Sequence, residues 1–86
     1  MPRALSLRQS RVPAVDRDRF RARARETQAH YAAAGCNYWV FEARAVAGAY
    51  VEFFEAPDAE ILMQAHRAAA DPTVSASTLY VQVELS

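Results

Sequence analysis

In the stretch AYVEFFEAPDAEILMQAH, residues 49–66, the side-chain pattern changes at its middle from that of a strand to that of a helix. Its first half is rich in aromatic and β-branched residues and indicates a strand. Pro57 and Asp58 then open a helix, because proline fits the first helical turn and aspartate caps free amide groups there. The stretch therefore predicts a strand that carries Glu52, followed by a helix with His66 on its inner stripe. It also raises the question of whether these two side chains form a catalytic pair.

The preceding residues 36–43, CNYWVFEA, have the same strand-like composition. A short connection, RAVAG, separates them from residues 49–56, which is typical of a β-hairpin. If the hairpin pairs Trp39 with Phe53 and Phe41 with Val51, the odd-numbered residues of its two strands share one face. A shift by one residue would reverse the faces of the first of these strands.

The flanking segments complete the fold. Residues 4–12 and 78–85 alternate between apolar and polar side chains and predict two more strands, and residues 71–77 predict a loop. Residues 16–35 predict a helix with Asp16 as N-cap and Gly35 as C-terminal cap. Its buried stripe recurs at helical spacing: Phe20, Ala24, Thr27 and Tyr31. The order predicts one α+β domain over residues 1–86, with a ferredoxin-like βαββαβ fold, an antiparallel sheet of order 4-1-3-2 and both helices on one face.

Composition narrows the function classes. The chain has 86 residues with ten basic and ten acidic side chains, so no net charge attracts it to nucleic acid or to an anionic membrane. The single cysteine, Cys36, cannot form an internal disulfide and favours a reducing compartment. The first residues are too polar for a signal peptide, and no apolar run approaches a membrane span. We expect a cytoplasmic protein without nucleic-acid or membrane partners. The two histidines and one cysteine show no zinc-site spacing, so no metal and no cofactor is expected.

Odd-numbered residues are the apolar ones on the first and last strands, and they are expected to face the helices. With the hairpin pairing above, odd residues face the helices on all four strands. The other sheet face is then aromatic and charged, and a second copy of the chain would cover it. Glu52 and His66 would lie on opposite sides of the sheet and could not act as a pair. The predicted dimer interface comprises Arg8, Tyr50, Glu52, Phe54, Tyr80, Gln82 and Glu84.

The chain resembles the dimeric α/β-barrel superfamily, and within it most closely the antibiotic biosynthesis monooxygenase branch. The motifs that carry this resemblance are a Gly-Cys start and an aromatic on the second strand, a Glu-x-aromatic on the third, and an acidic-Ala helix start followed by a histidine. They correspond to Gly35, Cys36, Trp39, Glu52, Phe54, Asp58, Ala59 and His66.

The resemblance implies a homodimer whose two sheets face each other, with a small-molecule cavity between the sheet and the helices of each subunit. It implies a cofactor-independent monooxygenase that acts on a phenol, quinol or anthrone-like ring. His66 would be the base, Asn37 and Trp39 would position the ring, and Tyr31 and Phe20 would line the pocket. Haem-degrading relatives use an Asn on the first strand and a Trp on the third, and this chain has neither there. The alternative is a non-catalytic homodimer that binds a small ligand or mediates assembly, with His66 as a structural residue.

Overall fold

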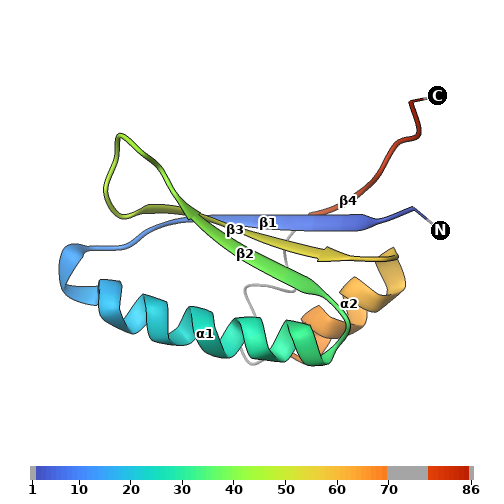
Figure 1. Cartoon of the computed structure of the whole chain (residues 1–86), viewed down its shortest axis with the longest axis horizontal. Coiled ribbons are helices and arrows are strands. Elements are labelled where there is room, and N and C mark those ends of the chain that lie inside the picture. The colour runs from blue at the N-terminus through green and yellow to red at the C-terminus, as the bar shows by residue number, and fades with distance from the viewer. Residues whose placement is uncertain (1, 70–77, 86) are drawn as a thin grey trace.

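The computed structural model describes residues 2–69 and 78–85. Strand β1 (Ala4–Arg11) leads through a 3-10 turn, η1 (Ala14–Asp16), into helix α1 (Arg17–Ala33). Strands β2 (Asn37–Glu42) and β3 (Ala49–Ala56) form a hairpin, and helix α2 (Ala59–Arg67) and strand β4 (Leu79–Val81) follow (Figure 1). The element order is the predicted one. The predicted loop 71–77 lies outside the described residues.

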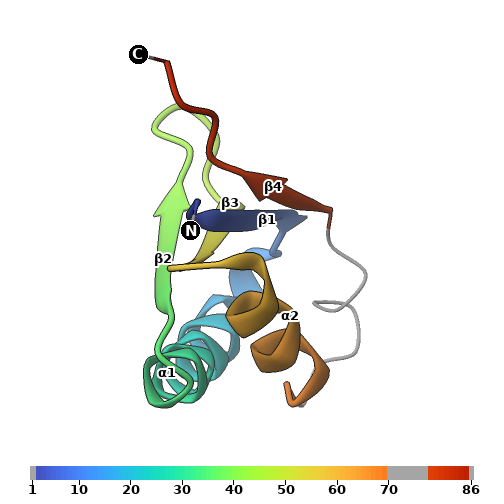
Figure 2. The ribbon, with the colours of Figure 1, turned by 90° about the vertical axis from the view of Figure 1, so that its right-hand side faces the viewer.

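The four strands form one antiparallel sheet in the order β2-β3-β1-β4, which is the predicted order read from the other edge. Both helices lie on the same side of this sheet, and the other side carries no element of the described chain (Figure 2). This α+β arrangement is consistent with a ferredoxin-like fold. No described helix has the length and apolar character needed to cross a membrane.

The β2–β3 hairpin has the register that places its odd-numbered residues on one face, with Trp39 opposite Phe53 and Phe41 opposite Val51. Its connection is held against the end of β1, because the Val12 amide donates a hydrogen bond to the Gly48 carbonyl over 2.8 Å. Gly48 has a φ of +85°, and a Cβ atom there would lie only 2.5 Å from the Val12 carbonyl oxygen. The close approach of the two backbones therefore requires glycine at this position.

The helix ends follow the predicted chemistry in most respects. The Asp58 carboxylate accepts a hydrogen bond from the Ile61 amide over 2.9 Å and caps α2. Gly35, with φ of +81°, follows the last turn of α1 as a left-handed C-terminal residue. Asp16 occupies the N-cap position of α1 but makes no capping bond with its side chain. Strand β4 is shorter than predicted, because it pairs only with the first residues of β1.

The predicted orientation of the sheet was wrong for three of the four strands. On β1, β2 and β3 the even-numbered residues face the helices, and the buried ones are Ala4, Ser6, Tyr38, Tyr50, Glu52, Phe54 and Ala56. The odd-numbered Trp39 and Phe41 are 47% and 55% exposed on the uncovered face. On β4 the odd residue Leu79 lies opposite Ser6 and packs against the core, as predicted. The apolar alternation grouped the residues of β1, β2 and β3 correctly but assigned these groups to the wrong sides of the sheet, and it wrongly placed Leu79 on the same face as Leu5.

The core between the layers is built mainly from aromatic rings. Tyr31 of α1 and Tyr38 of β2 pack on Phe54, with ring centroids 4.9 Å and 5.1 Å away. Leu62 and Ala65 of α2 close this cluster from the other helix. At the opposite end of α1, the ring of Phe20 stacks on Tyr50 at 4.4 Å.

Candidate functional site

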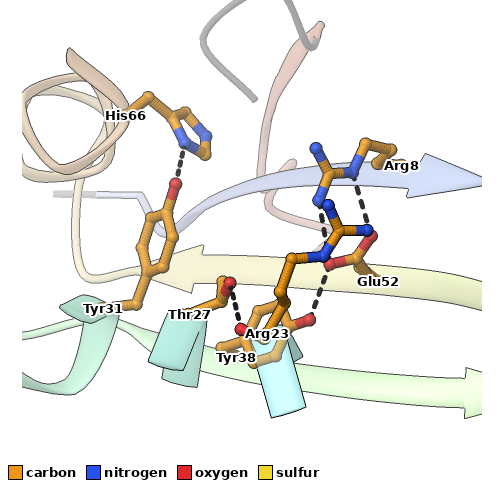
Figure 3. Close-up of polar contacts among 7 residues, drawn as sticks. All are labelled: Arg8, Arg23, Thr27, Tyr31, Tyr38, Glu52 and His66. Carbon is orange, nitrogen blue, oxygen red and sulfur yellow. Dashed lines mark hydrogen bonds and ion pairs between the residues drawn. The ribbon is translucent and has the colours of Figure 1, made fainter. Parts of the chain in front are cut away.

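A group of hydrogen-bonded polar side chains lies between the sheet and the helices. The His66 Nδ1 atom of α2 lies 2.6 Å from the Tyr31 hydroxyl, and its Nε2 atom lies 2.8 Å from the Ser6 hydroxyl. Figure 3 shows His66 and Tyr31 pointing toward each other from α2 and α1. All three residues are buried, with His66 only 4% exposed. Three different elements therefore meet at one imidazole.

The His66 imidazole is held in its neutral form. Its pKa is lowered, first by burial and then by the positive charge of Arg8 and by His30. A neutral imidazole has one nitrogen that donates a hydrogen bond and one that accepts. The hydroxyl groups of Ser6 and Tyr31 can each donate or accept, so both tautomers of the His66 ring have their hydrogen bonds satisfied. One ring nitrogen is in each case a proton acceptor, which is the state that a general base requires.

A second polar group lies on the same side of the sheet. The Arg8 guanidinium binds both oxygens of Glu52, with Nε–Oε1 and Nη2–Oε2 distances of 2.9 Å and 3.1 Å. The Tyr38 hydroxyl donates to Oε2 of the same carboxylate over 2.6 Å (Figure 3). The pKa of Tyr38 is strongly raised, first by burial and then by its hydrogen bond to Glu52 and the charge of that residue. Tyr38 is thus a permanent donor.

The two polar groups adjoin each other. Ser6 and Arg8 are alternate residues of β1, and the rings of Tyr31 and Tyr38 lie 6.3 Å apart in a stacked orientation. Glu52 and His66 therefore share the layer between sheet and helices, and the expectation that the sheet separates them was wrong. They are neighbours within one polar interior, with Glu52 bound by Arg8 and Tyr38 and with His66 bound by Ser6 and Tyr31.

The predicted dimer-interface residues divide between the two faces. Tyr80 lies opposite Leu5 on the uncovered face, and Gln82 continues the same alternation beside Arg3. Glu84 is exposed beyond the end of β4. The other four predicted interface residues lie on the helix-facing side, contrary to expectation, because the orientation of β1 and β3 is reversed: Arg8, Tyr50, Glu52 and Phe54.

The predicted ligand-binding residues also divide. Tyr31, which was expected to line the pocket, lies between the sheet and the helices and contacts His66 there. Asn37 and Trp39 lie on the uncovered face, where the Asn37 amide donates to Glu55 over 2.7 Å, so they cannot hold a ring against His66 from that face. Phe20 lies in the correct layer but stacks on Tyr50 near the start of α1.

Sequence reasoning missed Ser6, Tyr38 and the interior role of Arg8 and Glu52. A signal for them was present, since Ser6, Arg8 and Ser10 occupy every second position of a strand that the fold makes central. Polar residues on one face of a central strand need partners from the covering layer.

Neither the described histidines nor the described acidic residues gather into a group of three or more that could hold a metal ion. Cys36 is buried, and its thiol pKa is raised by burial and by the nearby Glu55.

The chain matches no family model, no curated protein and no solved structure.

Proposed function

We propose that the protein is a homodimeric, cofactor-independent monooxygenase for a small, weakly acidic aromatic compound, and that His66 is its base. The observation that supports the proposal is the neutral, buried imidazole of His66 between two hydroxyl groups. A base of this kind takes a proton near neutral pH and is oriented by its hydrogen-bond partners.

The polar character of the interior supports a functional role for it. A buried ion pair usually contributes no more stability than apolar residues of the same size, because both charges lose their hydration. This small domain nevertheless places Arg8, Glu52 and His66 between its layers. Ionisable groups that are buried together occur preferentially at functional sites.

The proposed chemistry uses the substrate as its own reductant. With an anthrone-like substrate, His66 removes one proton from the ring methylene. The carbanion reduces dioxygen and bonds to it, and the peroxide oxygen receives a proton from the His66 imidazolium. Loss of the second methylene hydrogen together with hydroxide then gives a carbonyl and water. One oxygen atom stays on the carbon and the other leaves as water. A substrate reaches the imidazole only when α2 moves away from β1, because His66 is 4% exposed.

The dimer belongs to the same proposal, now with the uncovered face as the interface. This face presents Trp39, Phe41 and Phe53, with the rings of Phe41 and Phe53 in edge-to-face contact at 5.6 Å. Large exposed aromatic side chains on one sheet face are typical of a protein–protein interface. Two such faces in contact would give the two-sheet barrel that the resemblance implies.

A non-catalytic homodimer is the second candidate, and one observation favours it. Both ring nitrogens of His66 already have partners, Ser6 and Tyr31, so the imidazole is satisfied without a ligand. In this case the polar interior serves only to fix the position of α2 on the sheet.

Oxygen uptake with anthrone and with substituted quinols, measured on the wild type and on His66→Gln, separates the candidates. Glutamine keeps polarity and approximate size but cannot take a proton near neutral pH. The monooxygenase requires a loss of about 10²–10⁴-fold in turnover with an unchanged fold and dimer. Labelled dioxygen must also place one oxygen atom in the product. No uptake with any substrate by the wild type would favour the non-catalytic candidate. An active His66→Gln variant with a lowered melting temperature would remove His66 from the mechanism and leave it a structural role.

A further inference from the structure

Three buried polar side-chain atoms of the described residues have no hydrogen-bond partner, and they belong to one corner of the molecule. They are the Ser10 hydroxyl at the end of β1, the Tyr50 hydroxyl at the start of β3 and the Arg17 Nε atom at the start of α1. An unpartnered buried donor is destabilising, because it loses its hydrogen bonds with water and gains none in the fold. Three in one place therefore need an explanation, such as a bound group.

The backbone and ring contacts bring the three residues together. Ser10 and Tyr50 are directly opposite each other in the β1–β3 pairing, so their side chains lie side by side on the helix-facing side. Arg17 approaches the same strand end, since its Nη2 atom lies 3.2 Å from the position of a Cβ on Gly48. Phe20, one turn further along α1, stacks on the Tyr50 ring and fixes the tyrosine there. We refer to Ser10, Arg17 and Tyr50 as the Ser10–Tyr50 corner.

An open groove adjoins the corner. It has a volume of about 500 Å³, and Ser10 and Tyr50 are part of its lining together with Arg11, Glu42 and Val51. The Glu42 carboxylate accepts a hydrogen bond from the Gly48 amide over 2.9 Å and so has a partner of its own. Arg11 and Val51 belong to the uncovered face by strand alternation, so the guanidinium group of the corner itself is that of Arg17.

We propose that the Ser10–Tyr50 corner is a binding site for the carboxylate group of a small organic acid, with the rest of the ligand in the groove. The corner offers one cationic N–H donor and two hydroxyl donors, which suits the oxygens of a carboxylate. Tyr50 is 6% exposed and supplies a fixed donor. This site is separate from His66, and the proposal goes beyond the monooxygenase function and does not depend on it.

Benzoate serves as the probe, and amide chemical shifts of the labelled wild-type chain report its position. We expect saturable shifts centred on Ser10, Arg17 and Tyr50. Tyr50→Phe and Arg17→Gln should each weaken binding about tenfold, because each removes a donor to a charged oxygen. Arg67→Gln is the matched control, since it removes one positive charge from the end of α2, away from the corner, and should leave binding unchanged. Benzyl alcohol, a neutral analogue, should bind more weakly than benzoate.

Thermal melts of the same variants show whether each variant is folded, so that a loss of binding can be separated from a loss of structure. Tyr50→Phe removes only an unpartnered hydroxyl and should fold like the wild type. Absence of shifts at millimolar benzoate, shifts centred elsewhere, or equal affinity of wild type, Tyr50→Phe and Arg17→Gln would overturn the proposal and leave ordered water as the partner of these atoms. Equal affinity for benzyl alcohol would overturn the carboxylate assignment.

Discussion

The Ser6 hydroxyl and the His66 Nε2 atom lie 2.8 Å apart, and this contact joins β1 directly to α2. The His66 Nδ1 atom extends the connection to Tyr31 and thereby to α1. One imidazole thus links the sheet to both helices, and changes around it should affect the stability of the whole fold.

Tyr31→Phe should lower the free energy of unfolding by about 1–3 kcal/mol. The substitution keeps the buried ring but leaves the Nδ1 atom of His66 without its partner. Urea denaturation measures the effect. Tyr80→Phe is the matched control, because the Tyr80 side chain is 52% exposed and its hydroxyl can bond to water. Equal stabilities of the two variants would contradict the structural importance of the Tyr31–His66 bond.

Glu52→Gln should lower the free energy of unfolding by about 3 kcal/mol. The variant leaves the Arg8 guanidinium between the layers without its counter-charge, which is the costly way to break a buried ion pair. The expected loss in the free energy of unfolding is at the low end of the range for buried ion pairs, because the Arg8 side chain remains 23% exposed. The matched control is Glu60→Gln on the exposed side of α2. In the double variant Arg8→Met/Glu52→Gln most of the loss should be recovered, and an additive further loss would refute this reading.

Stability should decrease as the pH falls below about 6.5. His66 has a lowered pKa in the folded protein and the ordinary value of 6.5 in the unfolded chain. Between the two values the unfolded chain binds more protons, so acid favours unfolding, and the effect is complete below the folded pKa. Denaturation of the wild type and of His66→Gln at pH 7.5, 6.5 and 5.5 isolates the contribution, since His30 is present in both. An identical pH dependence of the two proteins would assign the effect to other groups.

Trp39→Asp should convert a dimer into a monomer. It places a charge among the aromatic side chains of the uncovered face. Sedimentation at micromolar concentration should give twice the 9.6 kDa chain mass for the wild type and 9.6 kDa for the variant. Met63→Asp is the control, because Met63 is a partly exposed apolar residue on α2, outside this face. A monomeric wild type would refute the two-sheet barrel.

Gly48→Ala should destabilise the protein more than Gly35→Ala. Both glycines have a φ above +80°, where an alanine costs about 1–2 kcal/mol. At Gly35 a Cβ meets nothing within 4 Å, whereas at Gly48 it lies 2.5 Å from the Val12 carbonyl oxygen. Paired thermal melts test the ranking. Equal melting temperatures would mean that the backbone at the end of β1 shifts enough to accommodate a Cβ atom at position 48.

The arrangement of the chain could be predicted because its signals are local. Strand alternation, the Asp58 cap and the composition of the hairpin indicate the elements, and the strand order followed from the predicted fold. The Trp39–Phe53 register was one of two considered for the hairpin, and the structure has it. The sheet orientation could not be obtained in this way. Leu5 and Leu7 mark an apolar face, but nothing in their spacing tells whether helices or a second protein would cover it.

The candidate site was accordingly predicted only in part. His66 and Tyr31 come from helices, whose inner stripes can be recognised from spacing, and their contact is present in the structure. The strand residues of the site depend on the orientation of the sheet. Reversing it moved Arg8 and Glu52 inside and moved Trp39 and Asn37 to the uncovered face.

Arg8 and Glu52 lie directly opposite each other in the β1–β3 pairing, and this position affects which register the two strands adopt. β3 carries apolar side chains on both sides, and β1 buries a largely polar side, so hydrophobic pattern alone is a weak guide to the alignment of the two strands. An alignment shifted by one residue would leave Arg8 facing Val51 or Phe53 and Glu52 facing Leu7 or Gln9. The ion pair therefore adds little net stability, but a shift by one residue would separate the two charges and leave a charged group between the layers without its ion-pair partner, so charge favours the native pairing over this one.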